Sequence, residues 1–189
     1  MQGFKETLQK QFNLSESDWE ITEKYFKIEV IEPKQFFVKI GEVANKLGFV
    51  KSGILRSYTY DHEGKEVTLQ FFKKGTVVIV PYSFNEGVPV NENIISYEQT
   101  ELITTTSEEF SELYKKVSLW QHICKGVSEI KNDQLLDRAV QFQTNKAIDR
   151  YEEFCKCNPE ILKVVPLTHI ASFLGIDIAT LSRLRNNKQ

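Results

Sequence analysis

Between Ile28 and Thr106 the chain is divided into about eight short runs of β-branched and aromatic residues, separated by breaks that contain glycine or proline. The runs cover residues 28–31, 36–40, 49–51, 55–60, 67–72, 77–80, 94–97 and 102–105. Many short strands at this even spacing are typical of a small antiparallel barrel or jelly roll. Val67, Leu69 and Phe71 alternate with their neighbours, which predicts a strand with one buried face.

Helical patterns lie on both sides of this stretch. Phe4, Leu8 and Phe12 recur every fourth residue, and Ser15 is a candidate N-cap for a second N-terminal helix. After the last strand, Ser107 precedes two glutamates, which predicts that Ser107 caps another helix. The sequence therefore predicts an α+β fold: an antiparallel β jelly roll with flanking helices.

A longer helix is predicted over residues 117–140. Val117, Trp120, Cys124 and Val127 recur at intervals of three, four and three, which is the beginning of a coiled-coil pattern. These four residues are predicted to form the interface of a parallel homodimer. The alternative is that Trp120 packs against its own barrel.

The region from Leu167 to Arg185 contains the signals of two short helices joined by a tight turn. Ile170 and Leu174 share one helical face, Gly175 follows as a helix stop, and Asp177 can cap the next helix. Leu181 then faces back toward the first helix. This pattern predicts a helix-turn-helix, although an αα-hairpin that serves only as core has the same pattern.

The predicted second helix has a polar and basic outer face. Residues 163–189 carry four basic side chains and one acidic one, Asp177, so this end has a net charge of +3 in a chain whose net charge is −2. Arg183 can donate two hydrogen bonds to one guanine. The residues predicted to bind DNA are Thr168, Asp177, Thr180, Ser182, Arg183, Arg185 and Asn186.

Composition limits the other functions. The chain has no apolar run long enough to span a membrane, and its first residues lack a signal-peptide core, so a cytoplasmic protein is expected. Its three cysteines form no disulfide framework. A jelly-roll enzyme needs clustered metal ligands, whereas His62, His122 and His169 are scattered, and His169 is expected on a helix surface. No catalytic residue, metal or cofactor is predicted.

Two motifs resemble the CRP/FNR family of bacterial transcription regulators, and its Bacteroidetes members in particular. Val50-Lys-Ser-Gly-Ile-Leu-Arg-Ser-Tyr58, followed by Glu63-Gly-Lys-Glu-Val-Thr-Leu-Gln-Phe-Phe72, is similar to that family's barrel core. Thr180-Leu-Ser-Arg183 is similar to its helix-turn-helix. The resemblance implies a homodimeric regulator that binds double-stranded DNA. It implies a cyclic-nucleotide-binding-like domain (1–116), a dimerisation helix (117–140) and a DNA-binding domain (141–189).

The loop that holds the cyclic phosphate in nucleotide-binding members corresponds here to residues 80–95, which contain no Arg or Lys. A buried phosphate needs a cation, so we predict that this chain does not bind cyclic nucleotides. An uncharged or apolar effector, or none, is expected instead. The candidate effector pocket consists of Arg56, Tyr82, Ser83, Phe84 and Tyr97.

The recognition helix also departs from the family pattern. Ile178 and Ala179 stand where the family often has an arginine or proline followed by a glutamate. Apolar side chains can contact only a thymine methyl group. The alternative function is therefore an interaction protein that has lost sequence-specific DNA binding.

Overall fold

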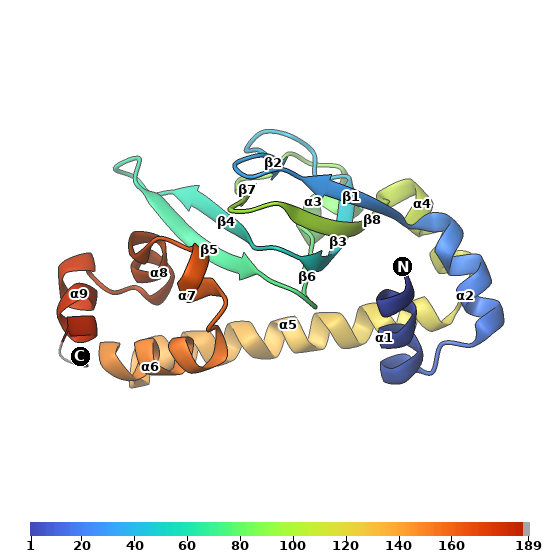
Figure 1. Ribbon diagram of the computed structural model, residues 1–189. Helices are drawn as coiled ribbons and strands as arrows, with labels where there is room; N and C mark the ends of the chain where they lie inside the picture. The colour runs from blue at the N-terminus through green and yellow to red at the C-terminus, as the bar shows by residue number, and fades with distance from the viewer. Residues whose placement is uncertain (187–189) are drawn as a thin grey trace.

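The computed structural model describes residues 1–186. Two stacked sheets lie above a long helix, α5, and the N-terminal helices pack at the opposite end from the C-terminal ones (Figure 1). The helices are α1 (Gln2–Phe12), α2 (Glu16–Thr22), the 3₁₀ turn η1 (Glu23–Tyr25), α3 (Pro81–Glu86), α4 (Ser107–Lys116), α5 (Leu119–Thr144), α6 (Ala147–Cys157), α7 (Ile161–Val164), α8 (Leu167–Leu174) and α9 (Ile178–Asn186).

The predicted jelly roll is confirmed. Its strands are β1 (Lys27–Ile31), β2 (Phe36–Val38), β3 (Lys46–Ser52), β4 (Leu55–Tyr60), β5 (Glu66–Phe72), β6 (Val77–Val78), β7 (Asn93–Ser96) and β8 (Thr100–Thr106). They form two antiparallel sheets with the orders β1-β8-β3-β6 and β2-β7-β4-β5. We call these the first and second sheet. Each predicted run coincides with one strand, although several ends differ by a few residues.

The space between the sheets is filled by aliphatic side chains and Phe72. Leu55, Ile94 and Leu102 have no measurable exposure there. The predicted single buried face of β5 is wrong, because Phe71 and Phe72 are both buried while Val67 and Leu69 are only half-buried. Both faces of β5 are covered: Phe72 faces the other sheet, whereas Phe71 packs against C-terminal helices.

A second core lies on the outer face of the first sheet, beneath α1, α2, α4 and the start of α5. Trp120 is 1% exposed there, stacks on Phe26 at 5.5 Å between ring centroids, and donates from Nε1 to Thr22 Oγ1 at 3.1 Å. Val117 is buried in the same cluster.

The predicted dimer seam is therefore corrected. Val117 and Trp120 are inside the protomer, Cys124 and Val127 are half-buried, and none of the four is fully exposed. A three-four-three spacing marks one apolar helix face, and here that face is covered by the chain's own N-terminal helices.

The predicted N-cap Ser15 is confirmed, whereas the predicted N-cap Ser107 is wrong. The Ser15 hydroxyl accepts from Asp18 N at 3.1 Å, as predicted. The cap of α4 is Thr106 rather than Ser107, because Thr106 and Glu109 form reciprocal side chain–backbone hydrogen bonds. From the sequence, the hydroxyl of either Thr106 or Ser107 could cap the helix, and only the backbone geometry shows which one does.

The predicted helix pair in residues 167–185 is present. Gly175 ends α8 with φ +60°, a conformation that favours glycine, and a Cβ at this position would lie 2.6 Å from a Phe142 ring carbon. Leu181 of α9 is fully buried against Ile170 and Leu174 of α8. The two helices thus pack through their apolar faces.

Candidate nucleic-acid interface

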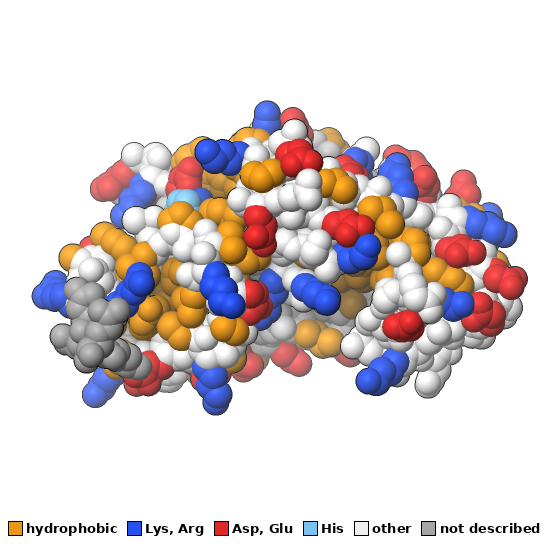
Figure 2. All heavy atoms as spheres, in the orientation of Figure 1, with side chains coloured by type: hydrophobic (Ala, Val, Ile, Leu, Met, Phe, Trp, Pro, Cys, Tyr) orange, Lys and Arg blue, Asp and Glu red, His pale blue; other side chains and the backbone are white. Residues whose placement is uncertain are grey.

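The outer face of α9 is exposed and polar. Asp177 caps the helix, because its Oδ1 accepts from Ala179 N at 2.9 Å and from Thr180 N at 3.2 Å. Ser182, Arg183 and Arg185 are exposed, whereas Leu181 faces inward. In Figure 2, Lys and Arg side chains surround the end of the molecule where α9 lies.

The other residues of the predicted DNA-binding set lie on or beside this face. Thr168 is exposed on α8, and Thr180 is half-buried. Arg183 Nε donates to Ala179 O at 3.3 Å, so its guanidinium folds back along its own helix. Asn186 ends α9, and its side chain lies outside the described part of the chain. Ile178, with 40% exposure, adds an apolar contact to the face.

The helix α8 is held against the second sheet. Thr68 N on β5 donates to Ser172 Oγ at 2.9 Å. From α5, Arg138 donates to Leu69 O at 2.6 Å and to Phe173 O at 2.9 Å, so one guanidinium connects the sheet, α5 and α8. Because one side chain donates to backbone carbonyls of two elements, the relative position of these elements is restricted. The α9 face is therefore held in a defined orientation relative to the jelly roll.

A polar cluster lies under α8, and sequence reasoning missed it. Arg56, only 2% exposed, donates to Thr68 Oγ1 at 2.9 Å and to Glu66 Oε2 at 2.6 Å. Tyr97 Oη and His169 Nδ1 are 2.5 Å apart, and His169 Nε2 lies 3.8 Å from Glu66 Oε2. The prediction of a surface position for His169 is wrong, because its ring is half-buried against Tyr97.

This cluster affects the charge of its members. Burial lowers the pKa of His169, and the Arg56 guanidinium lowers it further, while Glu66 opposes both. Burial likewise raises the pKa of Tyr97. Both side chains are therefore neutral near neutral pH, so the Arg56–Glu66 pair carries the formal charges at the junction between α8 and the sheet.

The five residues of the predicted effector pocket do not meet. Arg56 and Tyr97 lie under α8 on the outer side of the second sheet, whereas Phe84 packs on the first sheet's outer core. Ser83 is buried and accepts from Ala44 N, and Tyr82 is exposed, with its hydroxyl accepting from Asn91 N. Tyr82, Ser83 and Phe84 lie on the short helix α3, so they point in different directions, and Arg56 is on the outer face of its strand.

A half-buried acid, Glu92, lies just before β7 and beside Ser57 of β4. Ser57, on the same face of β4 as Leu55, donates to a Glu92 carboxylate oxygen. In the described residues 80–95 there is no Arg or Lys, although the Glu92 carboxylate interacts electrostatically with Lys131 of α5. Residues 1–186 also contain no group of three or more His, Cys, Asp or Glu placed to hold a metal. No helix in this part of the chain is long and apolar enough to cross a membrane.

Comparisons with known proteins agree with this architecture. The family model for the cyclic nucleotide-binding domain matches residues 28–117. No curated protein matches the chain.

Three solved structures with the same fold illustrate the likeness. The c-di-GMP-responsive global regulator CLP of Xanthomonas campestris is 17% identical, with a TM-score of 0.69 over 93% of this chain and 92% of its own. FixK2 of Bradyrhizobium japonicum is 13% identical, with a TM-score of 0.71 over 86% and 83%. A transcriptional regulator of the CRP/FNR family from Eubacterium rectale is 16% identical, with a TM-score of 0.67 over 91% and 82%. Residues 28–117 therefore match the model of the cyclic nucleotide-binding domain, and the chain shares the fold of these three regulators.

Proposed function

We propose that this protein is a homodimeric, DNA-binding transcription regulator whose sensor domain does not bind cyclic nucleotides. The observation that carries the proposal is the α9 face, on which Ser182, Arg183 and Arg185 are exposed while Leu181 anchors the helix from behind. A helix held from one side with a basic polar face outward has the form needed to enter a major groove.

The chain would divide into a sensor (1–116), a dimerisation helix and a DNA-binding part. Because α5 continues to Thr144, the boundary proposed at residue 140 moves to about Asn145.

The exposed side of α5 supports a dimer, in a different place from the seam predicted from sequence. Leu135 and Leu136 are each 64% exposed and Val140 is 49% exposed, although all three are apolar. Together with Ala139 they follow the helix face opposite the jelly roll, at the spacing that helix pairs use. We call this set the α5 stripe. An exposed apolar stripe on a long helix is a typical partner-binding surface.

Arg183→Ala is expected to reduce the discrimination between specific and random DNA by roughly 5- to 150-fold, because one bidentate base contact contributes about 1–3 kcal/mol. The measurement is a competition titration of a bound genomic fragment against random duplex. Lys10→Ala is the matched control, because it removes an exposed cation from α1, far along the chain from α9. Equal discrimination by wild type and Arg183→Ala would contradict the assignment.

Calorimetric titration with cyclic AMP or cyclic GMP at millimolar concentration is expected to give no saturable heat. A cyclic phosphate entering the jelly roll would meet Glu92 and no cation from residues 80–95, and burying an unpaired anion costs several kcal/mol. Arg56, the nearest cation on a strand, is already paired with Glu66 on the outer side of the sheet. A dissociation constant in the low micromolar range would overturn this part of the proposal.

The second candidate function is an interaction protein without sequence-specific DNA binding. The exposed Ile178 on the α9 face favours it, because an apolar side chain there can contact a protein partner as well as a thymine methyl group. In that case Arg183→Ala and wild type would bind all duplexes equally and weakly.

A further inference from the structure

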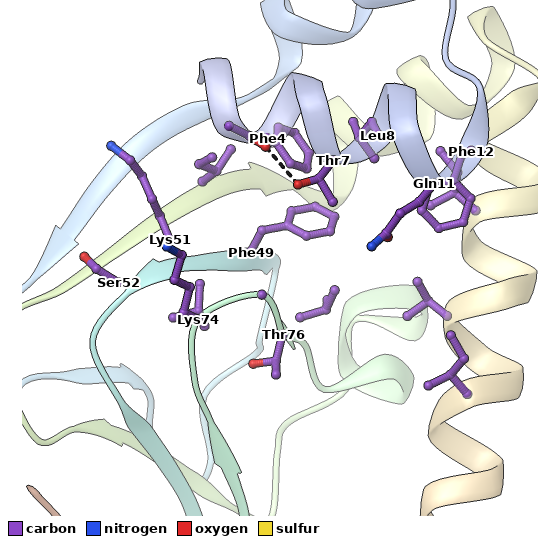
Figure 3. A pocket seen from close by; sticks show the side chains of 18 of the residues that line it. Phe4, Thr7, Leu8, Gln11, Phe12, Phe49, Lys51, Ser52, Lys74 and Thr76 are labelled. Carbon is purple, nitrogen blue, oxygen red and sulfur yellow. Dashed lines mark hydrogen bonds between the residues drawn. The ribbon is translucent and has the colours of Figure 1, made fainter. Parts of the chain in front are cut away.

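A cavity of about 550 Å³ lies outside the jelly roll, between α1, the outer face of the first sheet, the turn that joins β5 to β6, and α5. Figure 3 shows Phe4, Leu8 and Phe12 of α1 on one wall and Phe49 of β3 in its centre. None of its lining residues comes from residues 80–95, so it is separate from the loop that faces a cyclic nucleotide in related domains.

The wall of the cavity is largely apolar. Phe49 packs 4.6 Å from Phe4 between ring centroids, and α5 contributes Ile123, Val127 and Ile130. Ile130 is 56% exposed at this edge, so the apolar surface continues to solvent. A volume of this size lies within the range of about 300–1,000 Å³ that is common for small-molecule sites.

The charged residues around the cavity are mostly basic. The charged lining consists of Lys51, Lys74, Lys131 and Glu101. Lys51 already pairs with Glu101 at 2.7 Å. Lys74 and Lys131 form no hydrogen bond or ion pair within the described part of the chain, so two positive charges face the cavity without a close partner.

Lys131 is the more confined of these two cations. It is half-buried on α5, and burial lowers its pKa, while the charge of Glu92 opposes that shift. Lys74 is exposed on the turn before β6, and Figure 3 shows it beside Lys51 at the end of the cavity away from Phe12. A half-buried ammonium without a close anion is stabilised when an anion binds beside it.

We propose that this cavity binds an amphipathic organic anion, namely a long-chain carboxylate. Its hydrocarbon chain would lie among Phe4, Phe12, Phe49 and Val127, and its carboxylate would pair with Lys131 or Lys74. The bound molecule would contact both α1 and α5. This binding does not depend on DNA recognition by α9.

The first test is calorimetric titration of the full chain with dodecanoate, below the concentration at which it forms micelles and at neutral pH. Saturable binding is expected with about one molecule per chain. Dodecanol should bind at least about tenfold more weakly, because it lacks the charge-assisted contact. Dodecyltrimethylammonium should bind no more tightly than dodecanol. No saturable heat with dodecanoate, or equal affinity for all three head groups, would overturn the proposal.

Variants locate the site. Lys131→Gln and Lys74→Gln are tested singly, and the one that holds the carboxylate should weaken dodecanoate binding about tenfold while leaving dodecanol binding unchanged. Lys125→Gln is the matched control, because Lys125 lies on the same helix with a 76% exposed side chain and does not line the cavity.

Val127→Trp should fill the cavity and abolish binding of both dodecanoate and dodecanol. Thermal unfolding of each variant confirms that it is folded, and Val127→Phe is the smaller replacement if the tryptophan variant is not. Dodecanoate affinity that survives both lysine substitutions, or survives filling of the cavity in a folded variant, would show that the ligand binds elsewhere and would contradict the proposal.

Discussion

Trp120→Ala is expected to lower the free energy of unfolding by about 3–5 kcal/mol, which is the range for removing a large aromatic side chain from a core. Trp120 is 1% exposed, and its ring contacts Phe26 and Phe110 at centroid distances of 5.5 and 5.4 Å. The substitution also leaves the Thr22 hydroxyl without its indole donor. Chemical denaturation followed by circular dichroism measures the loss.

The control is Gln121→Ala, at the exposed neighbouring position on α5, which should change stability by no more than about 0.5 kcal/mol. The experiment also separates the two places considered for the dimer seam. A Trp120→Ala variant that keeps wild-type stability but dissociates into monomers would restore the seam predicted from sequence and contradict the burial of Trp120.

Leu136→Glu is expected to convert the proposed dimer into a monomer at micromolar concentration. In a two-fold dimer through the α5 stripe, each introduced carboxylate would lie against the apolar face of the other copy and near its own equivalent. Juxtaposed like charges in an interface cost several kcal/mol, so the dimer dissociation constant should rise by about 100-fold or more. Sedimentation equilibrium over a range of concentrations measures the change.

The matched control is Val30→Glu, which places the same charge at an apolar position that is 51% exposed on β1, away from α5. It should leave the sedimentation behaviour unchanged. A dimer that persists in Leu136→Glu with the wild-type dissociation constant would show that the α5 stripe is not the interface.

The order of elements could be predicted from sequence because each depends on local chemistry. Short β-branched runs between turns produced the eight strands, and Gly175 with Asp177 defined the end of α8 and the start of α9. Steric and capping preferences of this kind act within a few residues. They do not depend on what packs against the element later.

Which element packs against each helix or strand face could not be predicted, because this depends on tertiary packing. Val117 and Trp120 do form an apolar helix face, as predicted. This face packs against the chain's own N-terminal helices. The cluster of Arg56, Glu66, Tyr97 and His169 combines residues up to 113 positions apart, so no sequence spacing could reveal it. Only Arg56 indicated such a cluster, because it is a cation within a strand pattern. A cation at such a position needs a polar partner if it is buried.

The selection of DNA from a random duplex pool by the wild-type dimer tests the central claim, DNA recognition by α9, most directly. We expect enrichment of a near-palindrome whose two half-sites are about one helical turn, roughly 34 Å, apart. Binding to the enriched sequence should weaken steeply as salt rises, because Arg183 and Arg185 would displace counterions from the phosphates. A folded, dimeric protein that enriches no sequence over the starting pool at low salt would contradict the account.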